Sequence, residues 1–199
     1  MLTNASATLK ELIPVTPRGE ATRKKLLASA EIEFGSKGFP AASVSSITQR
    51  ADVGQGTFYL YFHSKEEVFA TLVRELGRQQ RQQIAEVASH SSAKKNGEQL
   101  LAQALLDSIA SDSGRYRILR EAQFVDEPVF RATHEQLLHA VADVLAATTR
   151  VGAATAEASL RAAALVGACE QVALQQCLWA DKQPSKAMVA AILQQPVGD

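Results

Sequence analysis

The sequence predicts an all-α protein of about nine helices, and three observations support this fold class. The 199 residues include 34 Ala and 16 Gln but only 11 Gly and 6 Pro, and Ala favours helix because it loses little entropy there. Apolar residues recur at the spacing of a helical turn along most of the chain. Capping and turn residues separate these periodic segments, so most of the predicted helices have recognisable ends.

The first periodic segment follows Met1–Pro17, which has no helical pattern and is predicted to be a flexible arm (residues 1–17). Within Gly19–Phe34, five residues share one helix face: Arg23, Leu26, Leu27, Ala30 and Phe34. Gly35 and Gly38 are predicted to end this helix, because glycine is favoured at helix C-termini.

Two short helices are predicted next. Ser43 is a suitable N-cap for the first, which lasts about two turns. Asp52-Val53-Gly54 interrupts the pattern, and Gln55–Phe62 then places Phe58 and Phe62 one helical turn apart on the buried side. Two short helices around a tight turn, packed against a longer first helix, form a helix-turn-helix.

A fourth, long helix and five more helices complete the prediction. Ser64 and Glu67 form a capping box that begins the fourth helix, and Ser89–Gly97 is predicted to be a polar loop. The remaining helices are expected at Glu98–Ala110, Arg115–Val125, Glu127–Arg150, Thr155–Ala180 and Ser185–Gln194. We therefore expect a helix-turn-helix domain at residues 18–65 and a C-terminal helical bundle at residues 66–199, which begins with the connecting fourth helix.

The charge and composition exclude several classes of protein. The 21 Lys and Arg balance 21 Asp and Glu, so a uniformly basic nucleic-acid-binding surface is excluded. No apolar run is long enough for a membrane helix and no secretory pattern precedes the first helix, so we expect a cytoplasmic protein. Cys169 and Cys177 are expected to be reduced core residues.

No metal site, cofactor or catalytic centre is predicted. His134 and His139 are five residues apart and diverge on a helix, whereas a helical zinc pair needs a spacing of four. The sequence contains no phosphate-binding loop, dinucleotide fingerprint, nucleophile elbow or HExxH motif. We therefore expect that the protein is not an enzyme.

Three segments within Arg18–Glu67 resemble the DNA-binding domain of the TetR/AcrR family. They are Lys24–Phe39, which ends in Phe34-Gly-Ser-Lys-Gly-Phe39, then Ser43-Val44-Ser45-Ser46-Ile47, and Gly56–Glu67, which contains Thr57-Phe58-Tyr59-Leu60-Tyr61-Phe62. The resemblance implies a homodimeric, all-helical transcriptional repressor that binds a palindromic operator. It also implies release of the operator by a small-molecule ligand held in the C-terminal domain.

The resemblance indicates which residues contact DNA. Gln55 would reach a base edge, where Gln can pair with adenine, and Gly56 and Thr57 would lie against bases. Residues expected to hold the phosphate backbone are Ser43, Tyr59, Tyr61 and Lys65, and the remaining candidates are Ser45, Leu60 and His63.

Three positions depart from the family pattern. Ser45 is short where many relatives carry a base-reading side chain, and Gly54 supplies no side-chain cap to the third helix. Asp52 stands where the turn often has Gly, although Asp tolerates the left-handed conformation. The resemblance therefore implies the fold but not the operator sequence.

Two further surfaces are predicted in the C-terminal domain. The last two helices are the expected dimer interface, through Ala156, Leu160, Ala163, Gly167, Ala168, Leu174, Leu178, Val189 and Ile192, although intramolecular core is a competing interpretation for half of them. The ligand is expected between the fourth helix and helices five to eight, near Phe69, Leu101, Leu105, Arg120, Gln123, Phe124, His134, Leu137, Val141, Glu170 and Trp179. This lining suits an apolar or aromatic molecule rather than a phosphorylated metabolite, because the domain shows no clustered basic pocket in sequence.

A function of another class is compatible with the same sequence. The alternative is a helical small-molecule-binding or enzymatic protein whose helix-turn-helix is only structural. An activator that uses the same DNA-binding domain is a third interpretation. Phosphate contacts release counterions, so an affinity for duplex DNA that falls steeply with salt distinguishes a regulator from the alternative.

Overall fold

The computed structural model describes residues 16–89, 93–148 and 156–194, and every regular element within them is a helix. The elements are α1 (Pro17–Lys37), α2 (Val44–Arg50), α3 (Gln55–Phe58), α4 (Lys65–Ser89), α5 (Ala93–Ala110), α6 (Ser113–Val125), α7 (Glu127–Thr148), α8 (Ala156–Val172), the π-helix η1 (Ala173–Trp179) and α9 (Lys186–Ile192). The predicted all-α fold class is therefore confirmed for the described part of the chain.

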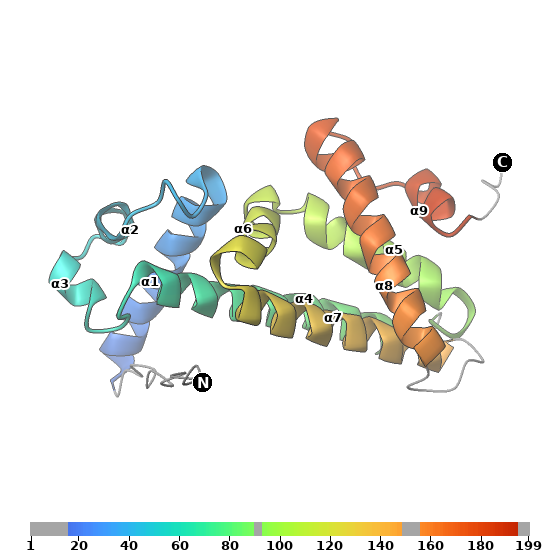
Figure 1. Ribbon diagram of the computed structural model, residues 1–199, viewed down its shortest axis with the longest axis horizontal. Helices are drawn as coiled ribbons and strands as arrows, with labels where there is room; N and C mark the ends of the chain where they lie inside the picture. The colour runs from blue at the N-terminus through green and yellow to red at the C-terminus, as the bar shows by residue number, and fades with distance from the viewer. Residues whose placement is uncertain (1–15, 90–92, 149–155, 195–199) are drawn as a thin grey trace, which may run out of the picture.

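Figure 1 shows an elongated molecule in which α1, α2 and α3 occupy one end. The helix α4 leads away from them and runs beside α7 along the molecule, while α8 crosses this pair. The helix α6 packs against α1 on one side and against α4 and α7 on the other. It therefore connects the end that carries α2 and α3 with the larger bundle.

Two hydrophobic cores hold the helices together. The first contains four phenylalanines that are almost completely buried: Phe34, Phe58, Phe62 and Phe69. Ile118 and Ala122 of α6 complete this core. The second core is formed by α5, α7, α8, η1 and α9 with the last turns of α4. Because the first core continues past residue 65 into α4 and α6, α6 is part of the support for α2 and α3.

The beginning of α1 differs from the prediction. It starts at Pro17, inside the predicted arm, because the Thr16 hydroxyl accepts a hydrogen bond from the Gly19 N–H at 3.1 Å. Proline also suits the first helical turn, where its missing N–H would have no partner. The rest of the predicted arm, residues 1–15, lies outside the described residues. The helix ends at Lys37 with Gly38 as its C-cap, whereas Gly35, the other predicted terminator, lies within α1.

The third helix is shorter than predicted. It ends at Phe58 rather than Phe62, and the next residues tighten into a turn in which the Tyr61 N–H donates to the Phe58 carbonyl at 2.9 Å. Phe62 nevertheless remains on the buried side, because its N–H also donates to the Phe58 carbonyl, at 3.0 Å. The predicted buried side of this segment is therefore confirmed.

Two segments of the bundle also differ from the prediction. The helix α5 begins at Ala93, inside the predicted Ser89–Gly97 loop, and has a non-helical residue at Asn96. The predicted Thr155–Ala180 helix is observed as α8 followed by η1, which widens into a π-helix from Ala173. In both segments the helical geometry changes locally, at Asn96 and from Ala173, and the chain after the change still packs against the second core.

Candidate nucleic-acid interface and effector cavity

The helix α2 is positioned by its cap and by a buried side chain. The Ser43 hydroxyl accepts a hydrogen bond from the Ser46 N–H at 3.0 Å, and the Ser46 hydroxyl accepts one from the Ser43 N–H at 3.1 Å. Ile47 is fully buried and anchors the helix in the first core. Ser43 and Ser45 remain exposed at the start of this helix. The predicted N-cap of α2 is therefore confirmed.

A tight turn sets the direction of α3. Asp52 adopts a left-handed φ of 55°, which an L-residue rarely does, and the Val53 N–H donates to the Thr48 carbonyl at 3.0 Å. Gly54 is the N-cap of α3 and makes no side-chain cap hydrogen bond, as the sequence predicts. The turn thus brings α3 to one end of the molecule (Figure 1), and Phe58 is fully buried in the first core.

The outer surface of α3 and its turn is polar and aromatic. Gln55, Gly56 and Tyr59 are exposed, and Leu60 is 68% exposed. A Cβ atom built at Gly56 would meet no heavy atom within 4 Å, so the backbone lies open on this surface. Tyr61 is only half-buried, although its side chain also packs against the first core. Gln55 and Gly56, which are predicted to face bases, thus lie on one accessible surface, and Thr57 beside them is half-buried.

Lys65 has contacts that the sequence does not predict. Its ammonium donates hydrogen bonds to the carbonyls of Phe39 and Ala42 at 2.9 and 3.0 Å, and it lies 4.1 Å from the centroid of the Phe39 ring. Two of its three donors are therefore used within the chain. In this structure Lys65 thus ties the start of α4 to the loop after α1, and its contact with a DNA phosphate, which would use the third donor, stays a prediction.

His63 is also engaged locally. Its Nδ1 lies 2.8 Å from a carboxylate oxygen of Glu67, and its backbone N–H donates to the same oxygen. The Ser64 hydroxyl accepts a hydrogen bond from the Glu67 N–H at 3.2 Å. The Ser64 and Glu67 side chains therefore both act at the start of α4, as the capping box predicts, although Glu67 reaches His63 instead of Ser64.

A buried carboxylate joins α2 to α1. Glu33 is 2% exposed, and its oxygens accept hydrogen bonds from Lys37 Nζ at 2.6 Å and Arg50 Nε at 2.8 Å. The Lys37 hydrogen bond, helped by those from Arg50 and Ser46, lowers the pKa of the Glu33 carboxyl to about 2, although burial opposes this. Because Arg50 is the last residue of α2, this group fixes how α2 lies on α1.

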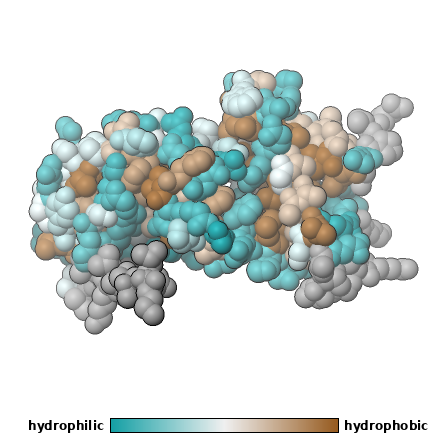
Figure 2. Space-filling view, viewed as in Figure 1, coloured by the Kyte–Doolittle hydropathy of each residue, from teal (hydrophilic) through white to brown (hydrophobic). Residues whose placement is uncertain are grey.

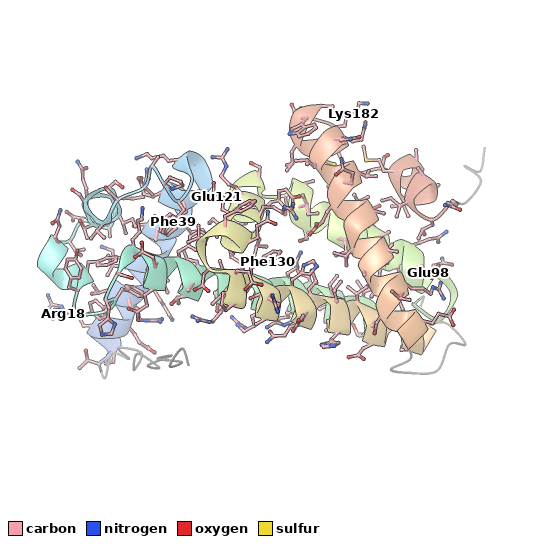
Figure 3. The ribbon with its side chains drawn as sticks, in the orientation of Figure 1. Arg18, Phe39, Glu98, Glu121, Phe130 and Lys182 are labelled. Atoms are coloured by element: carbon pink, nitrogen blue, oxygen red, sulfur yellow. The ribbon has the colours of Figure 1, made fainter. Side chains whose placement is uncertain are left out.

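Polar contacts from α6 hold the end of α1. The Glu121 carboxylate accepts a hydrogen bond from the Phe39 N–H at 2.7 Å, and Arg117 Nη1 donates to the Ser36 carbonyl at 2.8 Å. The two helices also approach closely, since a Cβ atom at Gly35 would lie 3.0 Å from Gly114 Cα. Figure 3 labels Phe39 and Glu121 beside each other where α6 meets this segment.

The other side of α6 lines a small cavity in the bundle. Its volume is about 40 Å³, and its walls come from α4, α5, α6, α7 and α8. The lining residues are Val73, Gln80, Ile109, Tyr116, Leu119, Arg120, Phe130, Thr133, His134, Leu137 and Glu170. Such a volume holds only a few water molecules, so the cavity must widen to accept a drug-sized molecule.

The cavity contains several polar groups. Arg120 Nη1 lies 3.4 Å from a carboxylate oxygen of Glu170, and the His134 ring stacks on Phe130 at 5.5 Å between centroids. Burial, with a smaller effect from the Glu170 charge, raises the pKa of the Tyr116 hydroxyl. These groups are able to orient a bound molecule by hydrogen bonds.

The cavity contains only part of the predicted ligand-contacting set. Four predicted residues line it: Arg120, His134, Leu137 and Glu170. The expectation is wrong for Phe124 and Trp179, which are 85% and 70% exposed, because their helix faces point outward. Four others are packed in the cores without lining the cavity: Phe69, Leu101, Leu105 and Val141. Gln123 is half-buried and does not line it.

Sequence reasoning found Arg120, His134 and Leu137 but missed four other cavity residues on α6 and α7: Tyr116, Leu119, Phe130 and Thr133. Tyr116, Leu119 and Arg120 follow the three- and four-residue spacing of one helix face, which is a signal in the sequence. Phe130, Thr133 and Leu137 show the same spacing on α7. The spacing alone identifies a shared face, but it does not show whether that face meets a solid core or a cavity.

A second, open groove lies between α4 and α7. It has a volume of about 430 Å³ and is lined by Arg74, Arg78, Arg81, Pro128, Val129, Ala132, Thr133 and Gln136. The expectation that this domain has no clustered basic pocket is therefore wrong. The three arginines are spaced along α4 at i, i+4 and i+7, which places them on one helix face.

The predicted dimer surface divides into an exposed and a buried part. Leu160 is 73% exposed, and Ala163 and Gly167 are exposed beside it on α8. In contrast, Val189 is buried in the second core of the same chain, so its predicted place on the outer surface is corrected. The half-buried members of the predicted set are Ala168, Leu174, Leu178 and Ile192, and Ala156 is the first residue of α8. Figure 2 shows hydrophobic residues exposed over α8 and α9.

Two kinds of feature are absent from the described residues. No helix among them is long and apolar enough to cross a membrane, and no group of three or more His, Cys, Asp or Glu side chains is arranged to hold a metal ion. Cys169 and Cys177 are free thiols in buried positions. Burial, with a smaller contribution from Glu170, raises the pKa of the Cys169 thiol to about 12, so it is not a reactive thiolate at neutral pH.

Comparison with known proteins supports the same assignment of the helix-turn-helix. Residues 26–72 match the family described as bacterial regulatory proteins, tetR family. The HTH-type transcriptional regulator YdgC of Bacillus subtilis is 35% identical over 114 residues, which cover 55% of this chain and 50% of that protein. The matched segment thus spans about half the length of this curated relative.

Solved structures show that the fold extends through the bundle. The fatty acid degradation regulator FadR from Bacillus halodurans superposes with a TM-score of 0.72 at 20% identity, over 92% of this chain and 95% of that chain. The transcriptional regulator FadR from Bacillus subtilis, solved in complex with stearoyl-CoA, gives a TM-score of 0.66 at 16% identity, over 86% and 95%. At these identities the similarity establishes the fold.

Proposed function

This chain belongs to the TetR family of bacterial regulatory proteins, and we propose that it is a transcriptional repressor that binds DNA and is released by a small-molecule effector. The observation that carries the proposal is the exposed surface of α3. There the open backbone at Gly56 lies beside the exposed side chains of Gln55 and Tyr59. A helix with this surface is able to approach base edges closely while its flanking side chains reach phosphates.

The proposed DNA contacts follow the sequence expectation, with a smaller role for Lys65. Gln55, Gly56 and Thr57 would meet base edges. The phosphate backbone would be held by Ser43, Tyr59 and Tyr61, with Ser45, Leu60 and His63 at the edges of the contact. Lys65 would reach a phosphate only with its third donor, because the other two donors of its ammonium brace α4. Glu33 supports the surface indirectly, because it fixes α2 against α1.

A single helix-turn-helix reads few base pairs, so the proposal includes a homodimer on a palindromic site. Two recognition helices would then enter successive major grooves about 34 Å apart. The exposed face of α8 is the proposed interface, because it combines a large apolar side chain at Leu160 with small residues at Ala163 and Gly167. Sedimentation at micromolar concentration should show a dimer, and a monomer would contradict this part of the proposal.

We propose that the effector releases the protein from DNA by shifting α6. One side of this helix lines the cavity through Tyr116, Leu119 and Arg120, and the other side holds the end of α1 through Arg117 and Glu121. An effector that widens the cavity must shift α6 or α7, and a shift of α6 changes the tilt of α1 to α3. The effector then weakens DNA binding by the ratio of its affinities for the two arrangements.

The effector is proposed to contain an apolar portion. The cavity is lined mainly by apolar and aromatic side chains, with Tyr116, Arg120 and His134 as polar anchors. The structural neighbour FadR from Bacillus subtilis binds stearoyl-CoA, which carries a long apolar chain. This similarity supports an effector of the same general character.

The experiment that tests the proposal begins with duplexes selected from a random library. The wild-type affinity for the selected duplex should fall steeply as salt increases, because each phosphate contact releases counterions. Tyr59→Ala should weaken binding to all sequences alike, whereas Gln55→Ala should relax discrimination at one base pair per half-site by about 1–3 kcal/mol. No duplex binding would contradict the proposed function, and an unchanged preference in Gln55→Ala would contradict the role of Gln55.

Gly56→Ala is expected to weaken DNA binding without lowering the stability of the fold. The added methyl group meets no heavy atom within 4 Å and Ala favours helix, so the free energy of unfolding should stay equal or rise by up to about 1 kcal/mol. The same methyl group would stand between the α3 backbone and the bases, so affinity for the selected duplex should fall about tenfold or more. Urea unfolding and duplex titration measure the two effects, and unchanged affinity would exclude close backbone approach at Gly56.

A further inference from the structure

The groove between α4 and α7 carries positive charge on one wall. Arg74, Arg78 and Arg81 project from one face of α4 over seven residues, a rise of about 10 Å. This span exceeds the size of one phosphate, so the three guanidinium groups match a ligand with more than one phosphate. Guanidinium groups suit such ligands because their donors pair with phosphate oxygens in a bidentate manner.

Most of this charge is not neutralised by the protein. Arg78 is held by Glu75, with distances of 2.6 Å from Nη2 to Oε1 and 3.2 Å from Nε to Oε2. Within residues 16–89, 93–148 and 156–194, Arg74 and Arg81 make no ion pair with a carboxylate. The groove therefore offers at least two guanidinium groups whose donors are available to an anion.

The opposite wall of the groove has a different chemistry. Pro128, Val129 and Ala132 of α7 face the arginines, so the groove is apolar on this side. Thr133 lines both this groove and the cavity beside α6. It packs tightly against α4 at Gly77, where a Cβ atom would clash with Thr133 Cγ2. One layer of side chains thus separates the basic groove from the effector cavity.

We propose that the α4–α7 groove binds the phosphates of an amphipathic small molecule through Arg74, Arg78 and Arg81, with the apolar chain of that molecule directed past Thr133 into the cavity. This inference rests on the proposed function, because a ligand in the groove regulates transcription only if the protein is a repressor that an effector releases from DNA. It assigns two parts of the effector to two sites, the anionic part to the groove and the chain to the cavity. An arginine cluster outside the helix-turn-helix thereby has a role independent of DNA.

The test compares Arg74→Gln/Arg81→Gln with the wild-type protein. The probes are lauroyl-CoA, which has phosphates and a chain, laurate, which has only the chain, and CoA, which has only the phosphates. Loss of two guanidinium groups should weaken lauroyl-CoA binding about tenfold or more and leave laurate binding unchanged. CoA should bind more weakly than lauroyl-CoA to the wild-type protein. Arg131→Gln is the matched control, because Arg131 is an exposed α7 residue paired with Glu127 and does not line the groove.

Several outcomes would overturn the inference. They are failure of the wild-type protein to bind lauroyl-CoA, equal lauroyl-CoA affinity in the double variant, and equal affinity of CoA and lauroyl-CoA. Arginine-dependent binding to phosphatidylglycerol vesicles without lauroyl-CoA binding would indicate a membrane surface instead. A parallel loss of affinity for the selected duplex would indicate DNA phosphates. Duplex binding is measured without ligand in the same series, so failure of the proposed function is visible separately from failure of the groove.

Discussion

Glu33→Gln is expected to lower the free energy of unfolding by about 3 kcal/mol at neutral pH. The Glu33 side chain is 2% exposed and receives charge-assisted hydrogen bonds from Lys37 and Arg50, so solvent screens it little. A glutamine of the same shape carries no charge and would present an amide N–H to one of the two cations. The loss should be measured by urea unfolding, together with a fall in duplex affinity as α2 loosens.

The pH dependence of the free energy of unfolding gives an independent check on the stabilising effect of the Glu33 charge. Its pKa is lowered to about 2 in the folded state and is near 4.5 when unfolded, so its stabilising effect is complete above about pH 4.5. The effect is lost as the pH falls from about 4.5 to 2. The stability difference between the wild-type protein and Glu33→Gln should therefore shrink across this window.

Glu75→Gln is the matched control for Glu33. Glu75 is also paired with an arginine, Arg78, at 2.6 Å, but its side chain is 41% exposed. Exposed ion pairs contribute at most about 1 kcal/mol, so this variant should change stability little. Equal losses in Glu33→Gln and Glu75→Gln would show that burial of Glu33 does not strengthen its ion pairs.

Gly38→Ala is the second substitution with a large expected effect, a loss of about 3 kcal/mol in the free energy of unfolding. Gly38 ends α1 with φ 82° and ψ 162°, a conformation that is nearly restricted to glycine. A Cβ atom there would also lie 2.8 Å from Glu121 Oε1, which is too close. The Glu121 carboxylate would then move and release its hydrogen bond from the Phe39 N–H.

A double-mutant cycle separates the two causes of this loss. Glu121→Ala alone should be destabilising, because the Phe39 N–H loses its partner. Added to Gly38→Ala, it should have a smaller effect, since the carboxylate is already displaced and its removal relieves the clash. Additive losses would mean that backbone strain alone explains Gly38. Gly56→Ala, which has open space around it, is the control for adding a methyl group.

Local signals in the sequence were sufficient for most of the helix-turn-helix. The Ser43 cap, the interruption at Asp52 and the paired Phe58 and Phe62 depend on residues a few positions apart, and the structure confirms each of them. The length of α3 was not predictable in the same way. Helical spacing places Phe62 on the buried side, but it does not reveal that the backbone tightens into a turn after Phe58.

The effector cavity and the groove show the limit of sequence patterns. Four of the predicted ligand-contacting residues line the cavity, but Phe124 and Trp179 point into solvent. An apolar residue gives the same sequence pattern whether its side chain fills a core, lines a cavity or lies on the surface. The basic groove was missed for a related reason, because Arg74, Arg78 and Arg81 form a pocket only when α7 lies beside α4.

By itself, the sequence determined the all-α fold, the capped helix-turn-helix and the family resemblance, because these depend on periodicity, caps and residues close together in the chain. Only the tertiary structure decided that Lys65 braces α4, that Glu121 of α6 holds Phe39, and that three arginines face α7. Glu121 and Phe39 are 82 residues apart, and nothing near either residue indicates the other. Such contacts exist only once the two cores have packed the helices together.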